Sequence, residues 1–580
     1  MSNNTLLIEA ESFADLGGWV VDQQFMDVMG SPFLLAHGMG IPVKDATTTV
    51  RFPKTGTYHL WVRTREWSGC KDTDMAPGKF SVLINREPVD VVFGTHGTEW
   101  HWQYGGSVDI QEVQVHLSLH DLTGFDGRCD ALLFSDDPDL EIPNKDPEMA
   151  QFRRTLSGAG DGVPERLTGY DLVVAGAGIA GICAAVAAAR KGLKVALIQN
   201  RPLTGGNNSS EVRVQLGGRI KEEPFPGLGN AVDQLDPHFR QNARQAFRYK
   251  DELKMKIVTD EPNIDLFLNM QATDVGMKEK DVIGSVVGQD VITGKRYEFH
   301  APLFADCTGD GAIGYRAGAD YRQGREARSE TKETLAPKKE DAFTMGSSVM
   351  WYSVKRKGTF SFPETPWAVQ FTDKTYQKVT RGDWNWELGL GLDQIKDAEA
   401  IRDYGFRVIF GNWSYLKNRA KEKEEYLNSR LEWVSFVAGK RESRRFMGDV
   451  VLRQQDIEKP ESWDDSCILT TWSIDLHYPI KMKGFKEAPF RTIARKKKIS
   501  PYLIPYRCLY SRNIKNLFLA GRNISVTHVA LGTVRVMRTT GLMGEAVGMA
   551  ASVCRRHGVL PREVYACHLN ELLESLKKGV

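Results

Sequence analysis

A glycine-rich turn between a buried-type strand and a small-residue helix constrains this chain more than any other feature. The apolar run Leu172–Ala175 leads into Gly176, Gly178 and Gly181, and a run rich in alanine follows. The first glycine permits a tight turn, the second lets the backbone approach a pyrophosphate, and the third lets the helix pack against the strand. The helix N-terminus adds partial positive charge. We therefore predict a dinucleotide site in a Rossmann-type α/β domain that begins near Tyr170.

The strand after this helix ends without the acidic residue that usually binds the adenosine ribose. Gln199, Asn200 and Arg201 stand at this point. The amide of Gln199 can still accept a hydrogen bond from the ribose, whereas Arg201 beside a 2′-phosphate would indicate NADP. The polar loop that follows is expected to wrap the phosphates and ribityl chain through Gly205, Gly206, Asn207, Ser209 and Ser210.

Three later segments have the pattern of the remainder of such a domain. A β-meander is predicted with strands at Ile264–Leu268 and Val282–Val287, and it ends in a strand followed by Cys307–Gly311. Close to the C-terminus, Leu517–Arg522 reads as a strand that returns to the same sheet. A glycine-rich helix is predicted over Thr540–Ala551.

Together these four segments resemble the FAD-dependent oxidoreductase family with a glutathione-reductase-type flavin fold, whose nearest subgroup includes putative xanthan lyases. The resemblance covers roughly residues 168 to 555. It implies one FAD and no second dinucleotide domain, and it leaves oxygen, a quinone or another protein open as the electron acceptor. The resemblance and the patterns above mark the following residues as cofactor-binding: Gly176, Gly178, Ile179, Ala180, Gly181, Gln199, Asn200, Arg201, Gly205, Gly206, Asn207, Ser209, Ser210, Thr308, Gly309, Asp310, Gly521, Arg522, Asn523, Gly541 and Met543.

Residues 1 to about 140 have short runs of alternating apolar and polar residues between turn residues, which is typical of an all-β sandwich. The run Ile8–Glu11 resembles the start of carbohydrate-binding β-sandwiches. A glycan-binding sandwich and a purely structural one both remain open.

The expected fold class is an α/β Rossmann-type FAD-binding domain with a mixed α+β cap domain, plus the N-terminal all-β sandwich. The predicted division of the chain is a sandwich at 1–140, a linker at 141–167, the first part of the FAD domain at 168–325 with an insertion at 215–260, a substrate or cap domain at 326–505, the second part of the FAD domain at 506–555 and a C-terminal helix at 556–580.

The segment between the return strand and the last helix contains the main candidates for catalysis. In the fold it passes the flavin ring, so His528 is predicted to take an alcohol proton while hydride leaves to the flavin. Arg535 or Arg538 would stabilise negative charge on the reduced ring. The alternative is that His528 packs near the site and the arginines form salt bridges.

Two further clusters are candidates for the substrate side. Asp475 and His477 lie two residues apart on a predicted strand and so share one face; a polar pocket and a structural pair are both open. The charged run Lys440–Arg445 is expected to be a solvated helix face, with a substrate-side position as the alternative. Most aromatic residues between 340 and 430 are expected in the core, and a few in a sugar site.

The charge and composition of the chain limit the classes of partner that it is expected to bind. The chain has 76 basic and 74 acidic residues, which gives no electrostatic footprint for nucleic acid. No apolar stretch is long enough to span a bilayer, no secretory signal is recognised, and no metal-ligand spacing appears. The eight cysteines are scattered, which favours a cytoplasmic location, with a periplasmic one possible. A homo-oligomer is possible.

The combined interpretation is an enzyme that oxidises a secondary alcohol of a sugar or glycoside by hydride transfer to FAD. Its substrate would be a small molecule or an oligosaccharide. Three alternatives stay open. The first is a flavin-dependent reductase or desaturase of a non-sugar substrate, with Arg535 or Arg538 as proton donor, and the second is a non-redox carbohydrate lyase or hydrolase that retains FAD. The third is a pure glycan-binding module, which is favoured only if the FAD site is degenerate.

Overall fold

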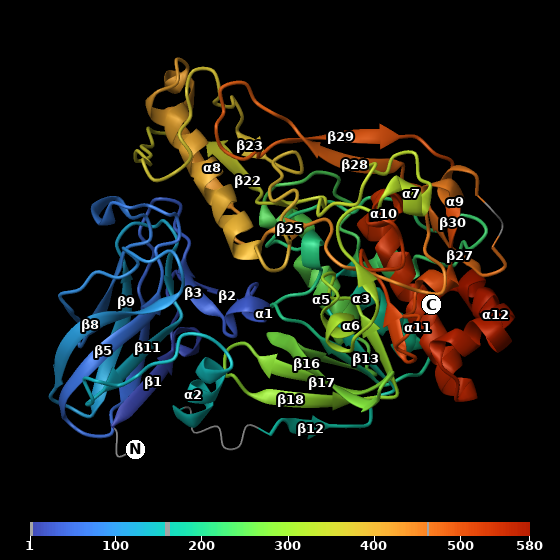
Figure 1. Ribbon diagram of the computed structural model, residues 1–580, viewed down its shortest axis with the longest axis horizontal. Coiled ribbons are helices and arrows are strands. Elements are labelled where there is room, and N and C mark those ends of the chain that lie inside the picture. The colour runs from blue at the N-terminus through green and yellow to red at the C-terminus, as the bar shows by residue number, and fades with distance from the viewer. Residues whose placement is uncertain (1–3, 157–162, 461–462) are drawn as a thin grey trace.

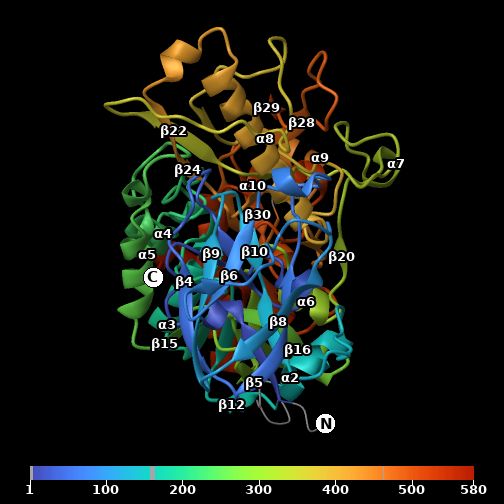
Figure 2. The ribbon, with the colours of Figure 1, turned by 90° about the vertical axis from the view of Figure 1, so that its left-hand side faces the viewer.

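An N-terminal β-structure, a central α/β core and a cap around one long helix make up the chain (Figure 1). The structure, a computed structural model, describes residues 4–156, 163–460 and 463–580. Viewed from the side, the sandwich lies in front of the core and the cap lies above both (Figure 2). The predicted fold class is confirmed.

The N-terminal part is a sandwich whose sheets share one apolar core. One sheet has the order β1-β11-β5-β8, spanning Thr5–Glu9, Ala131–Ser135, Gly56–Thr64 and His101–Ile110. The second has the order β4-β9-β6-β7, spanning Ala46–Arg51, Gln114–Asp121, Phe80–Ile84 and Glu87–Pro88. A third, β10-β3-β2, spans Gly127–Cys129, Phe33–Ala36 and Val20–Asp22, and the short helix α1 (Met26–Met29) follows β2. Alternate residues of the strands, such as Leu60 and Leu117, fill the core between the sheets.

The core of the molecule is a five-stranded parallel sheet in the order β15-β14-β13-β19-β31. Its strands span Ile264–Phe267, Val195–Ile198, Leu172–Ala175, Leu303–Asp306 and Leu517–Leu519. Every residue of β13 and β14 is buried, as expected for parallel strands covered on both faces. The carboxyl ends of these strands meet at one edge, which is where ligands bind in such sheets.

Two helices with small residues pack closely against each other beside this sheet. They are α3 (Ile179–Arg190) and α11 (Met537–His557). A Cβ atom at Gly544 would lie 2.0 Å from the Ala180 carbonyl oxygen, and one at Gly548 would lie 2.4 Å from the Ala184 carbonyl oxygen. Only glycine allows this approach. The remaining helices of the core are α4 (Asn230–Leu235), α5 (Asp251–Thr259), α6 (Ala312–Arg316), α10 (His528–Val534) and α12 (Pro561–Lys578).

One strand of the predicted meander belongs to a different sheet. The meander has the order β12-β18-β17-β16, spanning Glu165–Leu167, Arg296–His300, Val282–Asp290 and Met270–Glu279. The prediction for Ile264–Leu268 was therefore wrong, because β15 pairs in parallel with β14 at the edge of the core sheet. A short apolar run does not reveal which sheet it joins.

The cap consists of the long helix α8 (Ala398–Asn418) and several small sheets, which extend from this helix to the C-terminal helices of the core. Its strand pairs are β20-β26 (Tyr321–Arg322, Arg445–Phe446), β21-β25 (Ser347–Ser348, Gly439–Lys440), β27-β30 (Ser466–Thr470, Tyr502–Pro505) and β28-β29 (Ile474–Pro479, Thr492–Lys497), and β23-β22-β24 spans Arg381–Gly382, Trp351–Lys355 and Ser429–Val434. The helices α7 (Arg328–Thr331) and α9 (Gln454–Glu458) complete it.

The predicted linker at 141–167 contains regular structure on both sides of residues 157–162, which lie outside the described residues. Helix α2 (Glu148–Leu156) packs on β1, and β12 joins the meander. The predicted domain boundaries remain a prediction.

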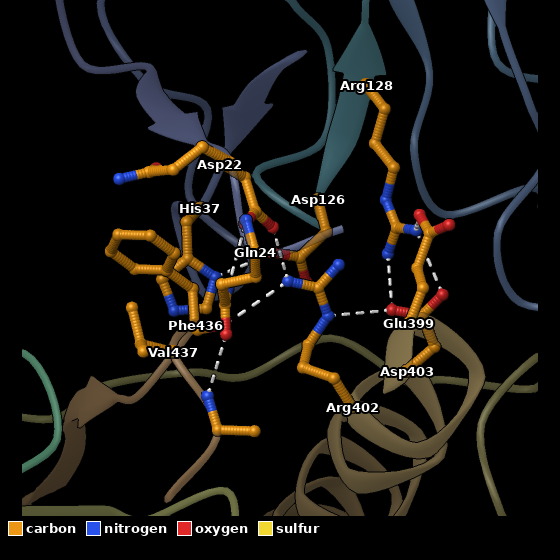
Figure 3. A network of polar contacts seen from close by, with 12 residues as sticks. Asp22, Gln24, His37, Asp126, Arg128, Glu399, Arg402, Asp403, Phe436 and Val437 are labelled. Carbon is orange, nitrogen blue, oxygen red and sulfur yellow. Dashed lines mark hydrogen bonds and ion pairs between the residues drawn. The ribbon is translucent and has the colours of Figure 1, made fainter. Parts of the chain in front are cut away.

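A buried network of ion pairs joins the sandwich to α8 (Figure 3). Arg402 of α8 binds Asp22 at 2.7 Å and Asp403 at 2.8 Å, and Arg128 of the sandwich binds Asp403 at 2.6 Å. Both guanidinium groups are fully buried. Removing one partner of such a network leaves an uncompensated buried charge, which costs about 3–5 kcal/mol. The sandwich is thus fixed to the cap.

Candidate active site

A cavity of about 490 Å³ opens at the carboxyl ends of β13, β14 and β19 and continues beneath the cap. Its volume is within the range of cofactor and small-molecule sites, about 300–1,000 Å³. Residues from the sandwich, the core and the cap all line it.

The glycine turn at one side of the cavity leaves room for a phosphate. Gly176 has a φ of +91°, and a Cβ at Gly181 would lie 1.7 Å from the Gly176 carbonyl oxygen. These two glycines therefore shape the turn and the helix approach. A Cβ at Gly178, by contrast, would meet no protein atom within 4 Å, and this residue is the N-cap of α3. The free backbone N–H groups of the helix thus face open space.

Most of the predicted cofactor residues meet around this cavity. Those that line it are Gly176, Gly178, Ile179, Ala180, Gln199, Asn200, Arg201, Gly205, Gly206, Asn207, Ser209, Thr308, Gly309, Asp310, Gly521 and Arg522. Those that are not among its lining residues are Gly181, Ser210, Asn523, Gly541 and Met543.

Packing and local hydrogen bonds explain the positions of the residues outside the lining. A Cβ at Gly541 would lie 2.4 Å from Cγ2 of Val232, so this glycine allows helix packing. The Asn523 side chain donates to the Asp306 backbone oxygen at 3.1 Å. Met543 is fully buried. Their predicted contact with the cofactor stays a prediction.

The side chains of Gln199 and Arg201 are occupied by the protein. Gln199 Oε1 accepts a hydrogen bond from the Ala177 backbone at 2.8 Å, and its Nε2 donates to the Leu203 carbonyl at 3.0 Å. Arg201 Nε binds Glu211 Oε2 at 2.9 Å. The interpretation of Arg201 as a ligand of a 2′-phosphate is thus left without support. The Gln199 side chain stabilises the glycine turn through its hydrogen bond from the Ala177 backbone.

The charged run Lys440–Arg445 is not a solvated helix face. It forms β25, a turn and β26, and Glu442 and Arg445 are fully buried. Lys440 and Arg441 line the cavity. The expected exposure was wrong because these charges are paired by residues distant in sequence, such as Lys440 with Asp310 at 2.6 Å.

Asp310 neutralises two cations at the cavity wall. Its carboxylate binds Lys440 Nζ at 2.6 Å and Arg522 Nη2 at 2.7 Å. Burial opposes ionisation, but these two positive charges outweigh it and hold the pKa of Asp310 well below its usual range.

A histidine oriented by a buried carboxylate faces the cavity. His477 Nδ1 lies 2.5 Å from Glu387 Oε2, and Arg535 Nη2 donates to His477 Nε2 at 3.1 Å. Because arginine only donates, Nε2 has no hydrogen in this arrangement, and Nδ1–H donates to Glu387. Both ring nitrogens of His477 are thus engaged at the cavity wall, Nδ1 with Glu387 and Nε2 with Arg535.

Glu387 is a functional residue that no sequence pattern indicated. It lies 90 residues from His477 along the chain. Its other oxygen accepts from the Gly346 backbone at 2.6 Å. Burial opposes its ionisation, but the charge of Arg441 and the hydrogen bonds from His477 and Thr492 lower its pKa to about 2.

Asp475 and Arg535 complete the group around His477. Asp475 and His477 both line the cavity, as their spacing on one strand predicted. Asp475 Oδ2 lies 3.5 Å from Arg535 Nη2. Despite partial burial, the contacts with His477 and Arg535 lower the pKa of Asp475 to about 2. Desolvation lowers the pKa of Arg535, and its Nε has no hydrogen-bond partner in the described part of the chain.

Acidic residues of the protein bind His528 and Arg538. His528 is 3% exposed, and its Nδ1 lies 2.9 Å from Glu442 Oε2. Arg538 Nε binds Asp236 at 2.9 Å. Neither residue is among those lining the cavity. His477, from the cap, lines the cavity, and the predicted roles of His528 and Arg538 beside the flavin stay predictions.

Most of the aromatic residues between 340 and 430 are in the core, as expected. Trp351, Trp386 and Trp413 are almost fully buried and pack together near α8. Trp384 is different, because it lines the cavity with its ring 5.2 Å from that of His477. Trp472 also lines the cavity.

These residues fit FAD. Gly178 leaves a space that a Cβ would fill, at a helix N-terminus suited to a diphosphate. Buried polar atoms without a partner in the described chain, Gln271 Oε1, Arg522 Nε and Arg535 Nε, belong to residues along the wall. Each of these atoms incurs a desolvation cost that a polar ligand would relieve.

The low pKa of Glu387 predicts a dependence of stability on acid pH. A carboxyl whose pKa is lowered on folding contributes stability that is fully present above its ordinary pKa of 4.5 and is lost as pH falls towards about 2. The contribution is roughly 3 kcal/mol. In urea unfolding from pH 5 to pH 2.5, we expect Glu387→Gln to flatten the acid loss relative to the wild type. Parallel curves for the two proteins would contradict this.

Two other features of the described residues concern membranes and metals. No helix there is long and apolar enough to cross a bilayer. The possible ligand atoms of His557, His568 and Glu571 lie within 4.8 Å of one another. The two imidazoles are stacked at 3.9 Å and Glu571 is paired with Arg556, so this surface group supports no metal site.

The comparison with protein families supports the dinucleotide site that the glycine turn predicts. The model of the FAD dependent oxidoreductase family matches residues 171–576. The comparison with the curated proteins found no match.

Several solved structures are similar to this chain over part of its length. A family 35 carbohydrate binding module from Clostridium thermocellum is 15% identical over 22% of this chain and 96% of that chain, with a TM-score of 0.18. The Mycobacterium smegmatis Sdh1 complex in the apo form is 13% identical over 68% and 69%, with a TM-score of 0.30. A geranylgeranyl bacteriochlorophyll reductase-like protein from Thermoplasma acidophilum is 13% identical over 72% and 84%, also with 0.30. These scores are too low to support an argument.

Proposed function

Because the chain belongs to the FAD dependent oxidoreductase family, we propose that it oxidises a secondary alcohol of a sugar or glycoside. It is an FAD-dependent enzyme, and the proposal concerns its reaction and substrate. The observation that supports it most is the imidazole of His477, which Glu387 holds at the wall of the cavity.

The residues that would hold FAD follow from the geometry. The N-terminus of α3 at Gly178 would bind the diphosphate, with Gly206 and Asn207 beside it. When bound, FAD supplies an acceptor for the hydride that leaves the carbinol carbon. Arg535, whose Nε has no partner in the described chain, supports negative charge in the cavity.

His477 serves as the general base in this proposal. Its Nε2 takes the hydroxyl proton of the substrate after the substrate hydroxyl has replaced Arg535 as its hydrogen-bond donor, and Glu387 keeps the ring in the correct tautomer through Nδ1–H. The imidazolium that forms is stabilised by Glu387 and by Asp475, whose Oδ1 lies 3.7 Å from Nε2. A positioned base of this kind contributes about 10²–10⁴-fold to the rate.

Two tryptophans on the wall support a sugar as the substrate. Trp384 and Trp472 line the same cavity as His477. Aromatic faces bury the apolar C–H patches of sugar rings, while Asp475 and Lys496 offer hydrogen bonds to hydroxyl groups. The cavity wall thus offers aromatic faces for the C–H groups of a sugar ring and polar side chains for its hydroxyl groups.

Anaerobic spectroscopy tests the proposal. Purified holoenzyme is mixed without oxygen with a panel of monosaccharides and glycosides, and flavin absorbance is followed in a stopped-flow instrument. We expect at least one sugar to bleach the flavin and to yield its keto product in a 1:1 ratio to FAD. Product release with a flavin that stays oxidised would instead indicate the non-redox lyase or hydrolase.

A second candidate is a flavin-dependent reductase of a carbon–carbon double bond. The observation that favours it is Arg535, a buried guanidinium with a lowered pKa beside the cavity, which would donate the proton. If this reaction is correct, chemically reduced enzyme is reoxidised anaerobically by an activated alkene, and sugars leave the oxidised flavin unchanged.

A reducing compartment is the proposed location. All eight cysteines are free thiols, and six of them are buried. Free thiols persist best in the cytoplasm.

A further inference from the structure

The sandwich reaches the cavity through the segment between β2 and β3. Gln23 donates from its Nε2 to the Asn200 carbonyl, and its Oε1 accepts from Arg201. Gln24 and Asp27 both line the cavity. Residues at the start of the chain are therefore part of the wall at the end of β14.

Asp27 and Gln271 present hydrogen-bond acceptors at this end of the cavity. Asp27 Oδ1 accepts from Arg316 Nη2 at 2.6 Å and from Gln271 Nε2 at 3.4 Å, so Oδ2 can accept from a ligand. Gln271 is 9% exposed, and its Oε1 is buried without a partner in the described part of the chain. A buried unpaired acceptor costs about 1–3 kcal/mol, which a donor on the ligand would offset.

The same end of the cavity lacks the acid that a Rossmann-type site usually supplies. That acid would follow β14, where Gln199 stands, and the Gln199 amide is occupied by Ala177 and Leu203. Adenosine carries donors, the two ribose hydroxyls and the 6-amino group, that need acceptors at this point. We propose that Asp27 and Gln271 supply them, so that the N-terminal sandwich is a working part of the FAD site.

The fixed position of the sandwich supports this proposal. Asp22, five residues before Asp27, is fully buried in its ion pair with Arg402 (Figure 3). Gln24 Oε1 accepts from the Ala438 backbone at 3.0 Å, and Ala438 itself lines the cavity. The segment that carries Asp27 is therefore held in place, and Asp27 itself is bound by Arg316. Its side chain loses little entropy on binding a ligand. A module tethered only by a linker could not offer such a preorganised contact.

The test uses full-length apoprotein, because ADP reports on the adenosine end alone. Binding of ADP is measured by isothermal titration for the wild type, for Asp27→Ala and for Gln271→Leu. The matched control is Asp90→Asn, an exposed aspartate of the same sandwich. We expect the Kd of ADP to rise about 10–100-fold for Asp27→Ala and to stay unchanged for the control, with equal unfolding temperatures for both proteins.

Two analogues of ADP identify which hydrogen-bond donor of adenosine binds Asp27. Wild-type apoprotein is titrated with 2′,3′-dideoxy-ADP, which lacks the ribose hydroxyls, and with inosine diphosphate, which lacks the 6-amino group. We expect one analogue to bind about as weakly as ADP binds Asp27→Ala, and to be insensitive to that substitution. The proposal is overturned if Asp27→Ala binds ADP as tightly as the wild type, or if the wild type binds both analogues as tightly as ADP.

Discussion

Replacing Gly178 by valine is expected to give a folded protein that purifies without FAD. A Cβ at this position meets no protein atom within 4 Å, so the apoprotein has room for the new side chain. The same room is the space in which a diphosphate must approach the N-terminus of α3. Valine also replaces glycine as an N-cap, at a cost of about 1 kcal/mol. Absorbance near 450 nm is expected to be lost, while the circular dichroism spectrum is retained.

A substitution at a second glycine, Gly544, is the control that distinguishes loss of FAD from loss of the fold. In Gly544→Val the new Cβ would lie 2.0 Å from the Ala180 carbonyl oxygen, so α3 and α11 must move apart. We expect this variant to unfold at a much lower temperature, unlike Gly178→Val. If Gly178→Val retained FAD at a 1:1 ratio, the diphosphate would lie elsewhere.

Replacing His477 by alanine is expected to lower the rate constant for flavin reduction by about 10²–10⁴-fold while FAD content stays unchanged. The imidazole contacts Glu387 and Arg535 and lines the cavity, but it lies on the cap strand β28, outside the glycine turn. Reduction is measured anaerobically in single turnover with the sugar that bleaches the wild type. Added imidazole is expected to restore part of the rate, which a merely structural defect would not show.

His528→Gln is the matched control for this substitution. His528 is also buried and also bound to a glutamate, Glu442, but it does not line the cavity. We expect it to lower the unfolding temperature and to leave the rate of flavin reduction within a few-fold of the wild type. A larger loss in His528→Gln than in His477→Ala would restore the sequence-based assignment of the base to His528.

Local patterns were sufficient to predict the phosphate end of the site. Gly176 and Gly178 stand in a strand–turn–helix context whose physics depends only on neighbouring residues, and both line the cavity. Thr308–Asp310 and Gly521–Arg522, which were also predicted to bind the cofactor, line the same cavity. In each case the required backbone conformation is encoded within a few residues.

Contacts between distant segments could not be predicted in this way. Asp475 and His477 were recognised as sharing one face, but Glu387, which orients the histidine, lies 90 residues away with no motif around it. The buried charges of Lys440–Arg445 look like a surface run until their partners are known. Asp27 has no sequence signal as a cofactor contact, because its role depends on how the sandwich docks on α8.

A crystal structure of the FAD-loaded enzyme tests the central claim most directly. We expect electron density for the diphosphate at the N-terminus of α3 beside Gly178. The isoalloxazine ring is expected at the wall formed by His477 and Arg535, and adenosine next to Asp27. Density that places the ring beside Asp27, or beside His528 with His477 remote from it, would contradict the account.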